Sequence, residues 1–247
     1  WMEDHENLYD KIKELFGTAP GSFNIMEDTI DVDLQMEYFE FSKKMAGEIE
    51  EEWAMERLDN LDDPDVTQHE KRQLLARLAT VEDVLAYRAI ERYMEHPDPE
   101  LREWTILALR ESRMHMESDL LEENQVFIST GLGGKGTKLR YFVVLIARNR
   151  EMINETQQKI IRIEFPEVLK RFNGEVEEIE SSGYLSAITL LLPIQYPVKQ
   201  VFNTVIETCN QYGDFLREHF IVTNVRKLSF EEIVDFIELR GKEEEED

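Results

Sequence analysis

A change of periodicity near residue 124 constrains the fold of this chain more than any other feature of its sequence. Up to residue 123, apolar side chains recur mainly at the three- and four-residue spacing of amphipathic helices. After Asn124, runs of β-branched residues alternate with helical stretches. We therefore expect an α+β protein with a helical domain over residues 1–123 and an α+β domain over residues 124–240. Residues 241–247 are rich in glutamate, which is typical of a disordered acidic tail.

Two stretches of the helical part have the spacing of amphipathic helices, namely Leu8 to Phe16 and Leu34 to Leu58. Between them, Ile30, Val32 and Leu34 alternate with aspartates, and this alternation predicts a short edge strand. The first part of the chain is therefore expected to be helical with one short extended segment.

Residues 62–121 contain two similar segments. An Asp-Pro pair precedes a helix at Asp63 and again at Asp98, and Leu75 and Leu107 of the two helices lie 32 residues apart. Proline suits the first turn of a helix, and a period in the low thirties is typical of stacked helical repeats. The segment VEDVLAYRAIERYMEHPDPELREWTILALRES (residues 81–112) resembles a HEAT or HEAT-like repeat, although Trp104 stands where small residues are usual.

The resemblance to HEAT repeats implies a surface that binds other proteins, because HEAT arrays generally act as binding scaffolds. It covers residues 62–121, which is about two repeats. The alternative is that so short an array only supports the neighbouring domain.

The second half is expected to have the element order ββαββαβα. Without its first strand this order is that of the ferredoxin-like fold, and two successive ββα units are the alternative. In both cases we expect one antiparallel sheet with helices on one face, and the strand order stays open. Pro166 is expected to break or restart the first helix, and Ser229 with Glu232 predicts a capping box for the last one. The expected strands are 126–130, 139–147, 175–180, 185–192 and 219–226, and the expected helices are 149–163, 198–209 and 230–239.

The charge of the chain is strongly negative but uneven. With 53 acidic and 28 basic side chains the net charge is -25, which argues against a general nucleic-acid binder, because phosphate neutralisation supplies most of that affinity. Residues 125–172 reverse the sign, with nine basic and four acidic side chains and a net charge of +5. This basic island has three interpretations: it docks acidic parts of the protein, it binds a phosphate-bearing ligand or RNA, or it is ordinary solvated surface.

The loop GLGGKGTK, residues 131–138, lies inside the basic island. Backbone N–H groups of such a loop can surround an anion. The loop is not a P-loop, because the GxxxxGK[ST] spacing is absent and a strand is expected to follow it. The alternative is a mobile hairpin loop whose glycines supply positive φ. The residues that we expect to bind an anionic ligand are Gly133, Gly134, Lys135, Lys138, Arg140, Arg148 and Arg150.

Other motifs do not identify a catalytic or metal site. The carboxylates Asp28, Asp31, Asp33 and Glu37 lack the spacing of an EF-hand, and the five histidines have no zinc-binding spacing. Cys209, the single cysteine, lies on the apolar stripe of its helix and is expected to be buried. We therefore predict no catalytic residue, no metal and no cofactor.

Compartment and partners follow from the same residues. One cysteine indicates a reducing compartment, and the most apolar stretch, Tyr184 to Ile194, is too short to span a membrane. We expect a cytoplasmic, non-membrane, non-enzymatic protein-interaction module, that is, an adaptor, assembly factor or chaperone-like binder whose partner is another protein or a second copy of the chain. The alternatives are binding or sensing of an anionic small molecule by the loop 131–138, and nucleic-acid binding by residues 135–150.

Overall fold

The computed structural model describes residues 23–48, 50–121 and 126–246. The helix expected from Leu8 to Phe16 lies outside the described residues. The chain divides into two compact units. Among the described residues, the helical unit contains 23–26 and the helices between 30 and 128, and the α+β unit contains 27–29 and 129–246.

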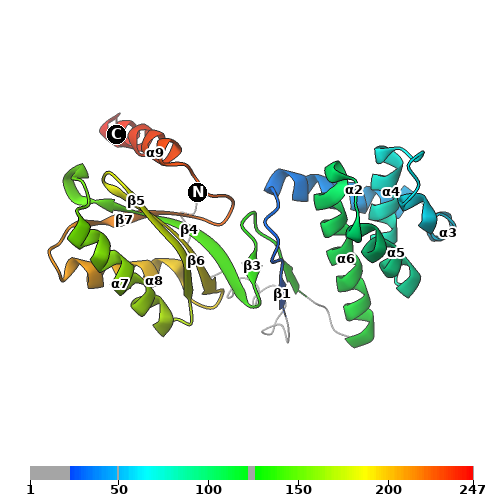
Figure 1. The fold of residues 1–247 in the computed structure, drawn as a ribbon, viewed down its shortest axis with the longest axis horizontal. Coiled ribbons are helices and arrows are strands. Elements are labelled where there is room, and N and C mark those ends of the chain that lie inside the picture. Colours follow the sequence, from blue (N-terminus) through cyan, green and yellow to red (C-terminus); the bar gives the residue numbers. More distant parts are fainter. Residues whose placement is uncertain (1–22, 49, 122–125, 247) are drawn as a thin grey trace. The chain divides into compact units, whose positions relative to one another are not determined.

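The helical unit is organised around one central helix, α4, which contacts the helices α2, α5 and α6 (Figure 1). One face of α4 is fully buried and packs against Trp104, Ile90 and Tyr38. Two short strands, β1 (Phe23–Ile25) and β2 (Val126–Ile128), pair in parallel. The helices are α2 (Val32–Glu48), α3 (Glu51–Met55), η1 (Leu58–Leu61), α4 (Gln68–Ala79), α5 (Val84–Glu95), η2 (Pro99–Leu101) and α6 (Arg102–Leu121).

The start of α2 corrects the expectation of a strand at residues 30–34. The Asp31 carboxylate accepts hydrogen bonds from the backbone N–H groups of Asp33 (2.8 Å) and Leu34 (3.4 Å). These contacts satisfy N–H groups that a helix start leaves unpaired, so the alternating aspartates belong to a helix terminus and not to an edge strand. The helix expected over 34–58 is also divided, into α2 and α3.

The second Asp-Pro turn is held by a partly buried ion pair. Lys71 of α4, which is almost fully buried, places its Nζ 2.9 Å from Asp98 Oδ2, and the Tyr93 hydroxyl donates to the same oxygen over 2.9 Å. The Asp98 carboxylate therefore ties together α4, α5 and the turn before α6. Asp98 therefore has a structural role in this turn, because its carboxylate is bound by Lys71 and Tyr93.

The α+β unit contains an antiparallel sheet with the strand order β5-β6-β4-β7, and the short strand β3 pairs with the start of β4. The α+β class expected from the sequence is confirmed, and the order β4-α7-β5-β6-α8-β7 is ferredoxin-like. The elements are β3 (Gly134–Lys135), β4 (Lys138–Ala147), η3 (Arg148–Arg150), α7 (Glu155–Arg171), β5 (Glu175–Ser182), β6 (Leu185–Pro193), α8 (Val198–Asn210), β7 (Leu216–Thr223) and α9 (Phe230–Glu246).

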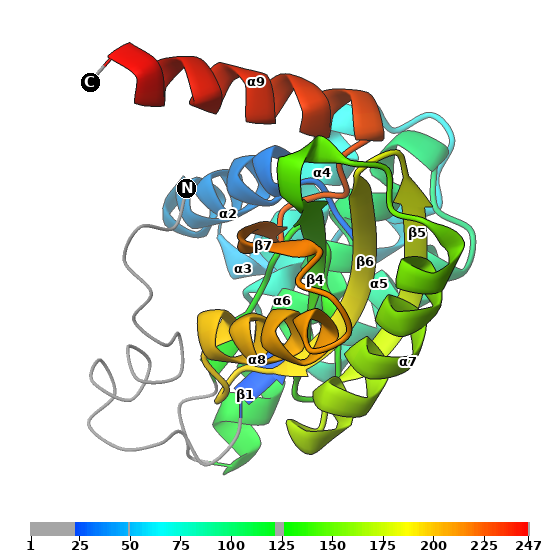
Figure 2. The same cartoon turned by 90° about the vertical axis from the view of Figure 1, so that its left-hand side faces the viewer.

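Helices lie on both faces of this sheet (Figures 1 and 2). On one face α7 and α8 pack, and Phe202 of α8 meets Phe220 of β7 with ring centroids 5.3 Å apart. On the other face the first half of α9 packs, with Ile233 completely buried against Phe142 and Val144 of β4. The expectation of helices on one face fits α7 and α8 but not α9, because the apolar stripe of α9 requires its own burial surface.

Three further expectations differ from the structure. The strand expected over 126–130 pairs with β1 in the helical unit, which leaves the place beside β4 free for β7. Helix α7 begins after its N-cap Asn154 and continues through Pro166 without a break. Helix α9 extends to Glu246, where a disordered tail was expected, because glutamate and lysine favour a helix that is already anchored by packing.

Candidate anion-binding site

The glycine-rich loop is in contact with another segment of the same chain. The Gly136 N–H donates to Glu27 Oε1 over 3.0 Å, and the Thr29 hydroxyl donates to the Leu132 carbonyl over 3.3 Å. A Cβ at Gly133 would lie 2.6 Å from the carbonyl oxygens of both Glu27 and Asp28. Residues 27–29 thus pack against the loop, and a carboxylate of the chain itself accepts the hydrogen bond that a bound anion would accept.

The basic side chains beside this loop are neutralised by strand β5. Lys138 Nζ lies 2.5 Å from Glu175 Oε1. Arg140 forms a two-pronged pair with Glu177, with Nε to Oε2 at 2.6 Å and Nη2 to Oε1 at 2.9 Å, and these bonds raise the pKa of Arg140. The remaining Arg140 nitrogen donates to the Leu132 carbonyl over 2.7 Å. Gly134 is buried in the β3–β4 hairpin, and Lys135 is exposed at its turn.

The two remaining expected residues, Arg148 and Arg150, lie at the opposite end of β4. The ten residues of β4 span about 33 Å, so the expected set does not converge on one site. The Arg148 backbone N–H donates to the Phe215 carbonyl (2.8 Å) and its Nε to the Leu216 carbonyl (3.1 Å). Its Nη2 lies 2.9 Å from Asp214 Oδ1, and 43% of the Arg148 side chain stays exposed.

The turn after β4 has an unusual backbone. Asn149 and Arg150 are adjacent residues with φ of 56° and 55°, in the left-handed region. Asparagine tolerates this conformation, whereas for arginine it costs about 1–2 kcal/mol. Strained backbone of this kind clusters at active sites and ligand-binding sites. The turn therefore makes this end of the sheet a candidate site.

The facing strand carries a large β-bulge. Leu145 of β4 pairs with Phe220, and Ala147 pairs with Leu216. Only Ile146 lies between the two pairs on β4, whereas three residues lie between them on β7: Arg217, Glu218 and His219. These three residues are displaced from the regular ladder. Bulges of this kind redirect side chains and are common next to binding sites.

The strained turn and the bulge line one pocket of about 300 Å³. The expectation from sequence included Arg148 from this set but missed the bulge residues, because the strand was expected to begin at His219 and begins at Leu216. The only signal was the polar run Arg217 to His219, which interrupts an otherwise apolar strand. The lining residues are Arg148, Asn149, Arg217, Glu218 and His219.

The chemistry of this pocket suits a small oxyanion. Arginine presents a planar fork of donors that matches carboxylate and phosphate groups. Arg148 uses part of its fork on Asp214, and within the described part of the chain the Arg217 side chain has no acidic partner. Arg150 lies two residues after Arg148 in the same turn, next to the lining residue Asn149, and in the residues described it is likewise not paired. The pocket thus offers donors that the fold itself does not use.

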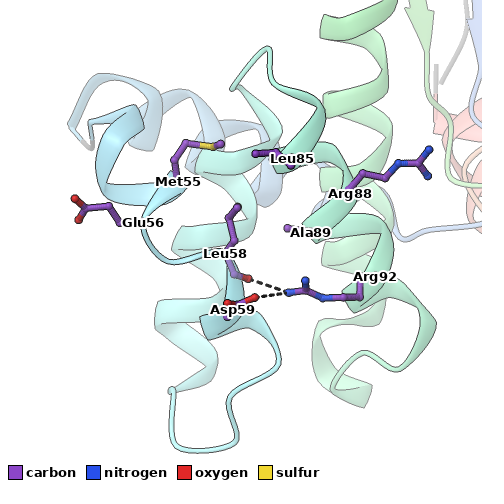
Figure 3. A pocket seen from close by; sticks show the side chains of 8 residues that line it. All are labelled: Met55, Glu56, Leu58, Asp59, Leu85, Arg88, Ala89 and Arg92. Atoms are coloured by element: carbon purple, nitrogen blue, oxygen red, sulfur yellow. Dashed lines mark hydrogen bonds and ion pairs between the residues drawn. The ribbon is translucent and has the colours of Figure 1, made fainter.

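A second pocket, of about 340 Å³, lies in the helical unit between α5 and the α3–η1 segment (Figure 3). Arg92 extends across it and donates to the Leu58 carbonyl (3.4 Å), to Asp59 (3.2 Å) and to Asp62 (2.8 Å). The Arg92 guanidinium is therefore committed to the fold, so this pocket offers fewer free donors than the pocket at the β7 bulge.

Other candidate chemistry has a structural role. Cys209 is fully buried, and burial raises the pKa of its thiol to about 12, so the thiolate is not available near neutral pH. Of the four acidic candidates, Asp31 caps α2 and Glu37 pairs with Arg72 at 3.4 Å. Among the described residues, no group of three or more His, Cys, Asp or Glu side chains is arranged to hold a metal. None of the described helices has the length and apolar character of a membrane span.

Comparison with known proteins gives matches only to solved structures. No family model and no curated protein matches the chain. A putative transposase from Deinococcus radiodurans R1 is similar with a TM-score of 0.37 and 12% identity, over 42% of this chain and 92% of the other. A REP-associated tyrosine transposase bound to a REP hairpin is similar with a TM-score of 0.31 and 14% identity, over 36% of this chain and 57% of the other.

These structures correct the first expectation about function. One is described as a putative transposase and the other as a REP-associated tyrosine transposase, and this finding contradicts the expectation of a non-enzymatic adaptor, assembly factor or chaperone-like binder. The likeness to HEAT repeats stays a prediction, because no family model matches. The TM-scores and identities are too low to transfer a substrate or a site residue to this chain.

Proposed function

We propose that the α+β unit binds a phosphate-bearing ligand in the pocket between the β4–α7 turn and the bulge of β7. Arg217 and Arg148 hold the phosphate oxygens, with Arg150 adding positive charge beside them. The observation that carries this proposal is the bulge, which takes Arg217, Glu218 and His219 out of the ladder and directs them to one pocket with Arg148.

The arrangement of charges supports an anionic ligand at this end of the sheet. Residues 129–227, which exclude the acidic helix α9, carry 13 basic and 11 acidic side chains, a net charge of +2, although the whole chain is at -25. Four of the acidic residues lie on β5, where Glu175, Glu177 and Glu178 pair with basic residues of the sheet and its loops. The strongly negative total therefore does not describe the surroundings of the bulge, which lies on the other edge strand.

The backbone strain supports the same site. A glycine would adopt the left-handed conformation at position 150 without cost, and the chain has arginine there. An arginine in this conformation sacrifices stability and adds a cation next to Arg148. This combination is expected where the side chain binds a ligand.

The experiment is calorimetric titration of the full chain with sodium pyrophosphate and with adenosine 5′-monophosphate at low salt. Arg217→Ala should weaken binding at least tenfold, or about 1.4 kcal/mol, because a hydrogen bond to a charged group contributes about 1.5–3 kcal/mol. Binding should also weaken as salt rises, since exposed charges are screened.

Matched variants separate the site from general charge. Lys159→Ala removes one exposed cation of α7, and Arg140→Ala removes a neutralised cation at the far end of β4. Both should bind the probes like the wild type. Equal losses in all three variants, or no binding of either probe by the wild type, would disprove the proposed site.

A further inference from the structure

The pocket at the β7 bulge contains one carboxylate that a simple anion site would exclude. Glu218 stands between Arg217 and His219 and lines the same pocket. It is exposed, and within the described residues its side chain makes no ion pair or hydrogen bond. Three of the four glutamates of β5 differ, because Glu175, Glu177 and Glu178 are each paired with a lysine or arginine.

An unpaired carboxylate beside a phosphate site restricts which phosphate-bearing ligands can bind there. Two like charges separated by about 4 Å repel each other by about 4 kcal/mol near a protein surface, so Glu218 disfavours a bare phosphate. An ionised carboxylate only accepts hydrogen bonds. The ligand that overcomes the repulsion therefore carries hydrogen-bond donors next to its phosphate.

Building on the proposed function, we infer that the ligand is a ribose phosphate, with the phosphate on Arg217 and Arg148 and the ribose 2′-hydroxyl donating to Glu218. In a nucleotide, the ribose that carries the phosphate also carries hydroxyl groups, which can donate hydrogen bonds. Acidic side chains recognise such a hydroxyl in dinucleotide-binding sites. The 2′-hydroxyl is also the group by which a protein distinguishes RNA from DNA. A free ribonucleotide and an RNA strand share this chemistry, and the experiment separates them.

The experiment compares matched ribose and deoxyribose probes on the full chain. Adenosine 5′-monophosphate and its 2′-deoxy form are titrated by calorimetry, and fluorescent oligonucleotides rA8 and dA8 by polarisation. The wild type should bind each ribose probe at least fivefold more tightly than its deoxy partner. If the mononucleotide binds more tightly than rA8, the source is a free nucleotide, and the reverse order assigns an RNA strand.

Substitution of Glu218 should change two affinities in opposite directions, that for ribose probes relative to deoxyribose probes and that for pyrophosphate. Glu218→Ala should abolish the ribose preference and raise the affinity for sodium pyrophosphate at least twofold, because a repulsive charge is removed. Glu207→Gln, an exposed change on α8, is the matched control for net charge and should alter neither value. A purely structural role for Glu218 would lower all affinities together.

The outcomes distinguish this inference from the function it rests on. If pyrophosphate binds through Arg217 but ribose and deoxyribose probes bind equally, the ribose inference is overturned and the phosphate site stands. If the wild type binds no phosphate probe, the proposed function itself fails. If Glu218→Ala weakens pyrophosphate and nucleotide to the same extent, Glu218 only supports the fold and the inference also fails.

Discussion

The two ends of strand β4 carry similar basic side chains but use them in different ways. At the start, Arg140 forms a two-pronged pair with Glu177, and Lys138 pairs with Glu175. At the other end, Arg148 is only partly engaged, and the facing residue Arg217 has no acidic partner in the described chain. The difference shows that a cluster of cations in the sequence identifies a binding site only where the fold leaves its donors unused.

The largest expected effect tests whether the glycine-rich loop is structural. Gly133→Ala should lower the free energy of unfolding by about 3 kcal/mol or more, because the new Cβ meets backbone carbonyls at 2.6 Å and φ is 65°. Gly136→Ala has a similar φ of 58° but open space around it, so it should cost only about 1 kcal/mol. Urea unfolding measures both, and equal losses would mean that the contact with residues 27–29 does not hold the loop.

The next effect contrasts stability with binding. Arg140→Ala should lower the free energy of unfolding by about 1–2 kcal/mol, because Glu177 loses its charged donor and the Leu132 carbonyl keeps only the Thr29 hydroxyl as a side-chain donor. Arg217→Ala should change it by less than about 0.5 kcal/mol, as is usual for a surface side chain that has no acidic partner among the described residues. Thermal and urea unfolding measure these values, and a reversed order would break the contrast between the two ends.

A smaller effect is expected in the strained turn. Arg150→Gly should raise the free energy of unfolding by about 0.5–1 kcal/mol, since glycine adopts positive φ without strain, although its flexible unfolded state offsets part of the gain. The same variant should weaken phosphate binding. Asn173→Gly relieves a similar φ of 54° after α7 and serves as the control. The phosphate affinity of Asn173→Gly should equal that of the wild type. If Arg150→Gly is more stable than the wild type but binds phosphate equally well, Arg150 does not belong to the site.

The smallest effect is a pH dependence at the loop end. The hydrogen bond from Lys138, helped by its charge, lowers the pKa of Glu175 below its ordinary value of 4.5. Because the folded pKa is depressed, the stabilisation is present above about pH 4.5 and is lost as the pH falls through the folded pKa. The difference in the free energy of unfolding between the wild type and Lys138→Met should therefore shrink as the pH falls from 6 towards about 3, which urea unfolding at several pH values measures. A difference that stays constant with pH would contradict this pairing.

Local patterns predicted local structure well. The apolar spacing from Val198 to Cys209 became α8, which buries Val201, Phe202, Val205, Ile206 and Cys209. The capping box was also correct, since Ser229 N–H donates to Glu232 (2.8 Å) and Glu232 N–H donates to Ser229 (3.2 Å). These features depend on residues within one or two turns of each other, so the sequence alone contains the information.

Features that depend on pairing between distant segments were not predictable. The bulge at Arg217 to His219 exists only relative to the register of β4, some 70 residues earlier in the chain. The neutralisation of Arg140 by Glu177 likewise requires β5 to lie beside β6 in a known register. A single sequence fixes neither register. The separation of Arg140 from Arg148 was predictable, because the expected strand 139–147 already places them at its two ends.

The contact between residues 27–29 and the glycine-rich loop also sets an order of assembly during synthesis. Glu27 and Gly136 are 109 positions apart, and almost all of the helical unit lies between them in the chain. Residues 27–29 leave the ribosome long before the glycine-rich loop, residues 131–138, has been synthesised. The intervening helices can therefore fold before the two segments meet. In chain topology the helical unit is an insertion within the α+β unit, so a fragment that begins at residue 129 would lack part of its own fold.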